Sequence, residues 1–492
     1  MRNLSSSELD PAALPRIRPI FVHAMWRTGS TYIWNKFREQ RRYRAYYEPL
    51  HEIFIDASSQ KLEAAWSDET TAVMRHPHLE ASYFEEYAPL IRAGGSRFGK
   101  GFPYRQYCLE ETEENEPLRR YLADLLILAL ANGQTPVLQF NRSLLRAGWL
   151  TRHFDPVNIL LLRRPIDVWK SFISFENRYF PTVICMIAGQ DRRHPLLEGL
   201  AGRHGVPFFE DQTWEAEYDF YREYASANLD RLYPLFYELY LLTSIYALRH
   251  ADCVIDLNEI SENAASRQRV TERLGALGIQ MSLDDCRLPV YTGLTEADQA
   301  CLAYEPSGRD DLKTTLPPEL LIPPERLEMQ QGMIGGHFQE IFSEFAGGPE
   351  TAMPPITGCA SSAEAQHREG LRLFEEGRVE EAAARFREAL LEAPAAELCP
   401  ELWNDWASAQ LACQRPELAE LGYRQARCAG DPQGAATANL AALLARLDRR
   451  QEAIPLLELA LRRAAPPEAK VLAGMLAECH SQPSAAGAPS PG

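Results

Sequence analysis

Long apolar runs, paired cysteines and clustered metal ligands are all missing from this chain of 492 residues. No run of about 18 apolar residues occurs, and the first residues, MRNLSSSE, contain no apolar signal region, so no membrane span is expected. The ten cysteines are scattered without a C-x-x-C pair, which predicts reduced thiols rather than a disulfide framework. These absences predict a soluble, cytoplasmic protein that binds no metal.

Positive charge is also scarce, because 51 Lys and Arg side chains stand against 68 Asp and Glu side chains. The net charge of −17 argues against a nucleic acid or an anionic membrane surface as the main partner. A hydrophobic content of 46% and a charged content of 24% are ordinary for a globular protein. A chain of this length is expected to form two or three domains.

The most informative segment of the chain covers residues 19–32. An apolar run leads into a short polar turn, and a helical pattern follows at once. In a strand–loop–helix of this kind, the loop N–H groups and the helix N-terminus can bind a phosphate or a sulfate. Gly29 allows a close backbone approach, Ser30 and Thr31 offer hydroxyl donors, and Arg27 adds a fixed positive charge.

A second apolar run, residues 158–162, is typical of a buried parallel strand. It ends in Arg163, and Pro165 then suits the first turn of a helix. Ser171 stands eight residues after Arg163, about two turns along that helix. Ligands of open α/β sheets bind at the carboxyl ends of the strands, so these two side chains can converge on one phosphate.

The string R-T-G-S-T (residues 27–31) resembles the 5′-phosphosulfate loop of the sulfotransferases. It lacks the first glycine and the lysine of the G-x-x-x-x-G-K-[ST] loop that binds ATP or GTP. The second motif is similar to the family's 3′-phosphate motif, with Arg164 where the family has an acidic residue. The resemblance implies 3′-phosphoadenosine 5′-phosphosulfate (PAPS) as the donor. It implies that the donor is bound by Arg27, Thr28, Gly29, Ser30, Thr31, Tyr32, Arg163 and Ser171.

The string Y-E-P-L-H (residues 47–51) follows the first expected helix. Carbohydrate sulfotransferases carry a similar E-P at this place, and the resemblance maps the catalytic carboxylate onto Glu48. An acceptor hydroxyl must lose its proton as it attacks sulfur, and a carboxylate or an imidazole within hydrogen-bond reach can take that proton. His51 is therefore the competing base, since cytosolic sulfotransferases use histidine. Arg27 would stabilise the charge that grows on the leaving phosphate.

Two further segments, residues 97–105 and 136–143, look basic and strand-like. The second is expected to be a sheet strand whose polar end carries Arg142 into the cleft, where this side chain would contact the acceptor. Surface charge is an alternative interpretation of both segments. Residues 252–260 look like a strand followed by an acidic turn, similar to a late segment of the family, and support the same sheet topology.

Beyond residue 345 the composition changes, first to a stretch rich in Gly, Pro and Ser. Small residues then recur close to the 34-residue period of tetratricopeptide repeats, as at Gly370, Ala407 and Ala441. The expected order is a sulfotransferase-like domain (16–345), a linker (346–362), a tetratricopeptide repeat domain (363–480) and a disordered tail (481–492). The repeats are expected to bind a protein partner. An unrelated helical bundle is the alternative interpretation.

The sequence thus predicts an α/β fold, a P-loop-like parallel sheet flanked by helices, followed by an all-α repeat domain. The expected activity is sulfuryl transfer from PAPS to an acceptor hydroxyl, with a carbohydrate favoured over a protein tyrosine or a small molecule. Two alternatives stay open at this point. One is a nucleotide-sensing scaffold that uses the repeats, and the other is a P-loop kinase, which the missing lysine disfavours.

Overall fold

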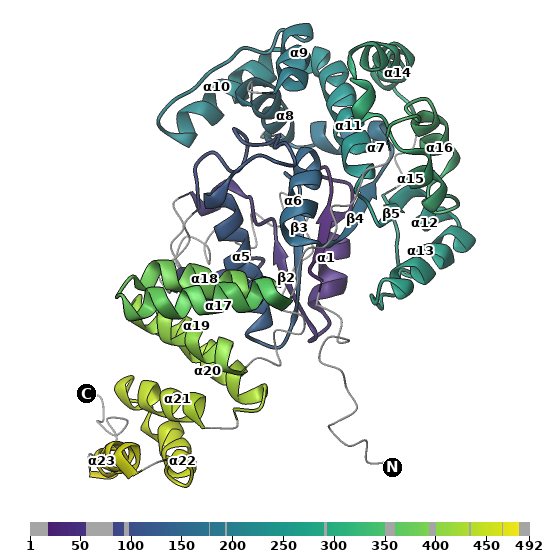
Figure 1. The fold of residues 1–492 in the computed structure, drawn as a ribbon. Helices are drawn as coiled ribbons and strands as arrows, with labels where there is room; N and C mark the ends of the chain where they lie inside the picture. Colours follow the sequence, from purple (N-terminus) through teal and green to yellow (C-terminus); the bar gives the residue numbers. More distant parts are fainter. Residues whose placement is uncertain are drawn as a thin grey trace, which may run out of the picture.

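The computed structural model describes residues 18–55, 82–92, 98–176, 178–191, 194–289, 293–349, 360–392, 400–431, 434–464 and 466–481. A five-stranded sheet lies at the centre of the molecule, with its strands in the order β2-β3-β1-β4-β5 (Figure 1). The strands are β1 (Ile20–His23), β2 (Tyr43–Tyr47), β3 (Thr135–Phe140), β4 (Val157–Leu162) and β5 (Cys253–Asp256). All neighbouring pairs are parallel, which confirms the α/β fold.

The central strands are short apolar runs because helices cover both faces of the sheet. Every residue of β1, β4 and β5 is buried. The register pairs His23, the last residue of β1, with Phe140 at the end of β3 and with Leu160 in β4. The carboxyl ends of these three strands therefore meet at one edge of the sheet.

Helices and short 3-10 turns connect the strands. Those before β4 are α1 (Ser30–Arg38), η2 (Glu52–Phe54), η3 (Glu85–Tyr87), α4 (Ala88–Arg92), α5 (Glu116–Leu130), η4 (Leu144–Arg146) and α6 (Ala147–Phe154). The crossover through α1 runs toward β2, whereas those through α5 and α6 run the other way along the sheet. Right-handed crossovers therefore place α1 on the opposite face from α5 and α6. The loop after β1 consequently lies at the switch point of the sheet, where α/β proteins bind ligands.

The segment between β4 and β5 is helical and forms a second core with residues 312–345, after β5. Its elements are α7 (Pro165–Ile173), α8 (Tyr179–Gln190), α9 (Pro195–Arg203), α10 (Trp214–Ala227), η5 (Leu229–Arg231) and α11 (Leu232–Leu248). After β5 follow α12 (Leu257–Glu262), α13 (Ala264–Ala276), α14 (Glu296–Thr315), η6 (Pro318–Leu320), α15 (Pro324–Met329) and α16 (Gly336–Ser343). Every residue of α11 except Pro234 is buried, as suits a helix that is apolar on nearly all sides.

The expectation of a strand at residues 97–105 is wrong, because the described part of this segment forms turns. The Phe102 N–H donates to the Gly99 carbonyl at 2.9 Å, and a Cβ on Gly99 would lie 2.8 Å from the Phe102 ring. Glycine thus permits a tight turn where the basic pattern suggested extension. Its described basic side chains, Lys100 and Arg105, pair with Glu217 of α10.

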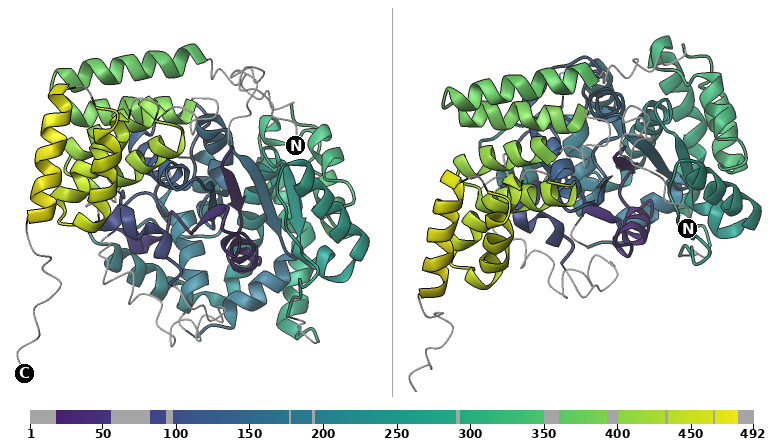
Figure 2. Two further views of the ribbon diagram at one scale, coloured as in Figure 1. Left: turned by 90° about the horizontal axis from the view of Figure 1, so that it is seen from below. Right: turned by 60° about the horizontal axis from the view of Figure 1, so that its bottom comes forward.

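The C-terminal part consists of three helix pairs and a last helix, seen together in Figure 2. They are α17 (Ala360–Glu375), α18 (Val379–Glu392), α19 (Pro400–Ala412), α20 (Pro416–Cys428), α21 (Ala435–Arg446), α22 (Arg450–Leu461) and α23 (Pro466–Ser481). Small residues mark the closest approaches within pairs. A Cβ on Gly370 would lie 2.5 Å from the Phe386 ring, and one on Gly422 would lie 2.8 Å from Ala407 Cβ. Most of the predicted linker and tail lie outside the described residues.

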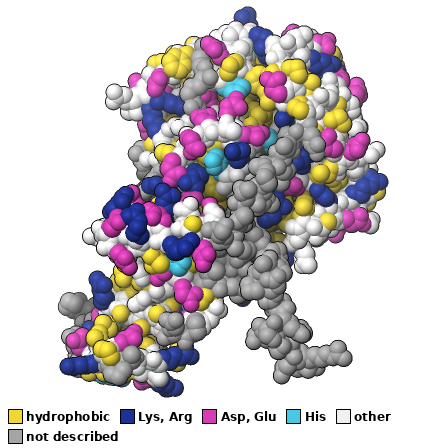
Figure 3. Space-filling model, viewed as in Figure 1, with side chains coloured by type: hydrophobic (Ala, Val, Ile, Leu, Met, Phe, Trp, Pro, Cys, Tyr) yellow, Lys and Arg dark blue, Asp and Glu magenta, His cyan; other side chains and the backbone are white. Residues whose placement is uncertain are grey.

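The helix pairs do not stand apart from the α/β part. Helix α18 packs on α5, where Arg387 Nε lies 2.8 Å from Asp124 Oδ1 and Glu388 pairs with Arg119. One hydrophobic cluster runs from the sheet into α18 and α19. On their outer side, α17 and α18 present intermixed basic and acidic side chains, which gives this face no single charge (Figure 3).

Candidate active site

The loop between β1 and α1 (residues 24–29) is held in shape by its own side chains. Thr28 is fully buried, and its hydroxyl donates to the Met25 carbonyl at 2.7 Å. Gly29 has a φ of 91°, and a Cβ there would lie 3.2 Å from Leu257 Cγ. Both the backbone conformation and the lack of space favour glycine at this position. The loop therefore presents a preformed backbone to whatever binds above the carboxyl edge of the sheet.

The two motifs that suggested a donor site contact each other directly. Arg27 Nε donates to Ser171 Oγ at 2.9 Å, and Arg163 Nη1 donates to the Arg27 carbonyl at 2.9 Å. The Tyr240 hydroxyl of α11 fixes the backbone of Arg163, because it accepts from the N–H at 3.1 Å and donates to the carbonyl at 2.7 Å. Residues that follow β1 and β4 thus converge with a residue two turns along α7.

The remaining residues of the donor motif differ in where their side chains lie. Ser30 is buried in the first turn of α1, and Thr31 Oγ1 lies 3.2 Å from the Tyr47 hydroxyl at the end of β2. The Tyr32 hydroxyl instead donates to Asp285 Oδ1 at 2.7 Å. Ser30 and Thr31 therefore belong to the region of the loop, whereas the Tyr32 hydroxyl is engaged elsewhere.

Arg164, the departure from the family's motif, directs its charge away from the loop. Its Nη2 donates to Glu262 at 2.9 Å, and its Nε lies 3.4 Å from Asp167 Oδ2. Its backbone N–H donates to Asn258 Oδ1 at 2.8 Å. The side chain is 44% exposed, so its ion pairs are solvent-screened and worth little to stability.

Glu48 directly follows β2 and is 5% exposed, with a φ of 41°. Asn141 Nδ2 donates to its Oε1 at 2.7 Å, and Arg142 donates to its Oε2. Because β2 and β3 are neighbours, residues that follow these two strands lie side by side. A buried carboxylate needs such donors, since a lone buried charge is costly.

Arg142, which the sequence placed against the acceptor, is 1% exposed and contacts protein groups instead. It pairs with both Glu48 and Glu52, and its guanidinium lies over the Trp26 ring at 4.9 Å. Burial by itself would lower the pKa of Arg142, but the charges of Glu52 and Glu48 raise it well above its usual value. Arg142 thus joins the region of Glu48 to the loop, where Trp26 precedes Arg27.

A second carboxylate, which sequence reasoning did not single out, completes this cluster. Glu52 Oε1 accepts from the Tyr179 hydroxyl at 2.7 Å, and its Oε2 accepts from the Tyr104 hydroxyl at 3.1 Å and from Arg142 at 2.5 Å. Burial alone would raise the pKa of Glu52, but Arg142 and the other donors lower it to about 2. The sequence signal that could have identified Glu52 is its position four residues after Glu48.

His51, the competing base, lies next to this cluster. Its Nδ1 accepts from the Ile53 N–H at 3.1 Å, which leaves the proton of a neutral ring on Nε2. Burial is the main cause that lowers the pKa of His51, so the ring is neutral near pH 7. A neutral ring whose Nδ1 is engaged offers no free acceptor in this tautomer.

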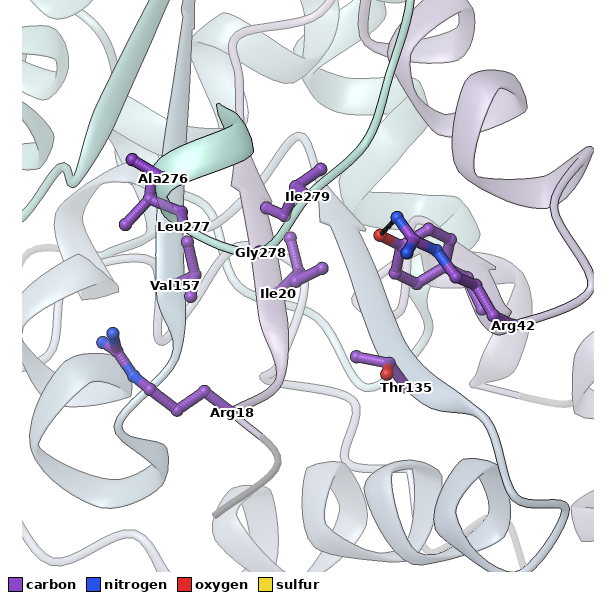
Figure 4. Close-up of a pocket in the computed structure, with 10 residues that line it drawn as sticks. Arg18, Ile20, Arg42, Thr135, Val157, Ala276, Leu277, Gly278 and Ile279 are labelled. Carbon is purple, nitrogen blue, oxygen red and sulfur yellow. Dashed lines mark hydrogen bonds between the residues drawn. The ribbon is translucent and has the colours of Figure 1, made fainter. Parts of the chain in front are cut away.

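A cavity of about 370 Å³ lies at the amino edge of the sheet, away from the residues above (Figure 4). Its lining residues are Arg18, Ile20, Arg42, Tyr43, Thr135, Val157, Ala276, Leu277, Gly278 and Ile279. Arg18 there donates to the Pro156 carbonyl at 2.6 Å and lies 3.4 Å from Asp155 Oδ1. Its charge is therefore already balanced, and the cavity is separate from the candidate site.

Within the described ranges, no group of three or more His, Cys, Asp or Glu side chains is arranged to hold a metal ion. None of the helices described is both long enough and apolar enough to cross a membrane. Comparison with protein-family models, with curated proteins and with solved structures finds no match to this chain. The arguments for function therefore rest on the residues of the site.

Proposed function

We propose that this chain is a sulfotransferase that moves a sulfuryl group from PAPS to an acceptor hydroxyl. One observation carries the proposal. Arg27 of the loop is hydrogen-bonded to Ser171 and, through its carbonyl, to Arg163, so both halves of the donor motif meet at the switch point of the sheet. Basic side chains and a helix N-terminus at such a place favour an anionic nucleotide.

The proposed roles on the donor side follow from charge and position. The N–H groups of the loop and of the first turn of α1 would bind the 5′-phosphosulfate, and Arg27 would stabilise charge on the leaving phosphate. Arg163 and Ser171 would hold the 3′-phosphate and so fix the position of the sulfur. Most of the rate enhancement would come from this positioning and from electrostatic stabilisation.

On the acceptor side, Glu48 is the proposed general base. The acceptor oxygen would form a bond to sulfur while the bond from sulfur to the bridging phosphate oxygen breaks, and its proton would pass to Glu48. The electron pair of the broken bond would stay on 3′,5′-bisphosphoadenosine. The engaged Nδ1 of His51 supports Glu48 over His51 in this role. A carbohydrate hydroxyl is the proposed acceptor, by the resemblance at Glu48, with a protein tyrosine or a small molecule as alternatives.

A second candidate function is a nucleotide-sensing scaffold without transferase activity. It is favoured by the observation that both oxygens of Glu48 already accept hydrogen bonds from Asn141 and Arg142. In this candidate the C-terminal helix pairs, which we infer to be tetratricopeptide repeats, would recruit a protein partner. The close approaches at Gly370 and Gly422 support the repeat assignment.

The test is the melting temperature of the full chain with 3′,5′-bisphosphoadenosine or with ATP–Mg²⁺. A ligand at 100 times its Kd adds about 2.7 kcal/mol to the free energy of unfolding, so the melting temperature must rise. We expect a rise with the bisphosphate alone and PAPS-dependent sulfation of at least one carbohydrate, detected by mass spectrometry. A rise without any transfer would favour the scaffold. A rise with ATP–Mg²⁺ alone would contradict the proposal and point to a kinase.

A further inference from the structure

Two carboxylates share one arginine inside the candidate site. Arg142 Nη1 pairs with Glu48, and its Nη2 pairs with Glu52 at 2.5 Å. All three side chains are more than nine-tenths buried. The described cluster thus holds two negative charges and one positive charge in a place where water cannot screen them.

We propose that Arg142 is a counter-ion shared by two carboxylates, and that Glu52 is a positioning residue which keeps Glu48 available as a base. This inference rests on the proposed function. An arginine that faced Glu48 alone could form the two parallel hydrogen bonds that guanidinium and carboxylate prefer. That arrangement would stabilise the ionised form of Glu48 and weaken it as a proton acceptor. Glu52 prevents it because it holds one end of the guanidinium.

The hydrogen bonds around Glu52 support its proposed role as the carboxylate that holds Arg142. Both phenols of the cluster, Tyr104 and Tyr179, donate to Glu52. Burial is the main cause that raises the pKa of these phenols, so they remain protonated donors. Glu52 is therefore fixed as an anion by three donors, and it can hold Arg142 in place while Glu48 reacts.

The other groups near the two carboxylates are few among the described residues. Those whose charges act on the cluster or feel it are His51, the buried cation Arg146 and six phenols, Tyr47, Tyr87, Tyr104, Tyr107, Tyr179 and Tyr218. His51 is neutral near pH 7, and the phenols are protonated because burial raises the pKa of each. Among the described cations, Arg142 is the one that forms ion pairs with both carboxylates.

The first experiment measures turnover against pH in the full chain. Glu52→Gln should shift the acid limb of the profile to lower pH by about one unit, because Arg142 then acts on Glu48 alone. Binding of 3′,5′-bisphosphoadenosine should stay within about twofold of the parent. Tyr179→Phe should give a smaller shift in the same direction. The matched control is Glu238→Gln, another buried carboxylate in an ion pair, at Arg203.

The inference would be overturned if the acid limb of the pH profile were unshifted in Glu52→Gln. A loss of activity without that shift would show only that the substitution disturbs the structure of the site. The control Glu238→Gln should keep the parent profile whatever its stability. If the parent binds no bisphosphate and transfers no sulfuryl group, the proposed function fails instead, and the sharing of Arg142 is then decided by a measurement that needs no activity.

That second measurement is a double-mutant cycle on the free energy of unfolding. Either Glu48→Gln or Glu52→Gln alone leaves Arg142 with one carboxylate, whereas the double variant leaves a buried cation unbalanced. We therefore expect the double variant to lose more stability than the two single variants together. Additive losses would show that the two carboxylates do not share Arg142 and would overturn the inference independently of catalysis.

Discussion

At the residue scale, two residues of the candidate site have backbone conformations that L-amino acids rarely adopt. Arg27 has a φ of 65° and Glu48 a φ of 41°, two of six non-glycine residues with positive φ in the described ranges. Each such residue costs about 1–3 kcal/mol, so its surroundings must hold it there. Ser171 and Arg163 hold Arg27, and the donors after β3 hold Glu48. Strain of this kind gathers at functional sites, which is consistent with the proposed roles.

Ser171→Ala should weaken binding of 3′,5′-bisphosphoadenosine by about tenfold, since one hydrogen bond to a charged group is worth about 1.5 kcal/mol or more. Arg163→Ala should weaken it further. Isothermal titration of the full chain measures both. Ser174→Ala, directly after the same helix, is the matched control, because Ser174 is exposed and donates to the Ser171 carbonyl. Unchanged affinity in both variants would remove the donor-motif assignment.

Glu48→Gln should cut turnover by about 10²-fold or more, as loss of a general base does, while bisphosphate affinity is retained. The amide keeps the shape of the side chain and its contact with Arg142, so stability should change less than activity. His51→Ala is the comparison, with turnover near the parent value. The reverse pattern, an active Glu48→Gln and an inactive His51→Ala, would assign the base to His51.

At the scale of elements, the sequence predicted what depends on local patterns. The apolar run at 158–162 and the strand expected within 252–260 are β4 and β5, and Arg163 lies at a strand end because Pro165 starts a helix at once. The arginine shared by Glu48 and Glu52 could not be predicted, because the contact depends on the pairing of β2 with β3, two strands that are far apart in the sequence. Local patterns fix strand ends, whereas contacts between strand ends follow from sheet order.

His23 at the end of β1 ties three strands together. Its Nδ1 lies 2.7 Å from Ser143 Oγ after β3, and its Nε2 lies 3.0 Å from Asn158 Oδ1 in β4. Burial lowers the pKa of His23 from 6.5 to about 4. The unfolded chain therefore binds the proton more readily, and stability is lost as the pH falls from 6.5 to 4.

A measurement of the free energy of unfolding as a function of pH tests the link between protonation of His23 and unfolding. We expect the slope between pH 6.5 and 4 to be smaller in His23→Gln than in the parent, because the variant has no group to protonate there. His250→Gln is the comparison, since burial lowers the pKa of His250 to about 3, and the loss of stability linked to this histidine therefore extends to lower pH. An unchanged slope in His23→Gln would mean that His23 does not link protonation to unfolding.

At the scale of the whole molecule, the helix pairs and the α/β part form one continuous structure. The sequence indicated a boundary at 346–362, and composition alone gives no sign that α18 packs on α5. The contact is made by Arg387, which is 3% exposed, and by apolar residues that join one cluster with those of the sheet. Through α5, the C-terminal helices support the strand that precedes Asn141 and Arg142, so a partner bound to them could influence the site.

The ion pair between Arg387 and Asp124 allows this coupling to be measured. Removing one partner of a largely buried pair leaves the other charge uncompensated, so Arg387→Leu should lower the free energy of unfolding by about 2–4 kcal/mol. Arg387→Leu combined with Asp124→Leu should recover part of that loss. Urea unfolding of the parent should give one transition, and Arg387→Leu should separate the unfolding of the helix pairs from that of the sheet. Two transitions in the parent itself would mean that the helix pairs are stable independently of the sheet. A loss of stability that Asp124→Leu does not reduce would mean that the ion pair contributes little to the interface.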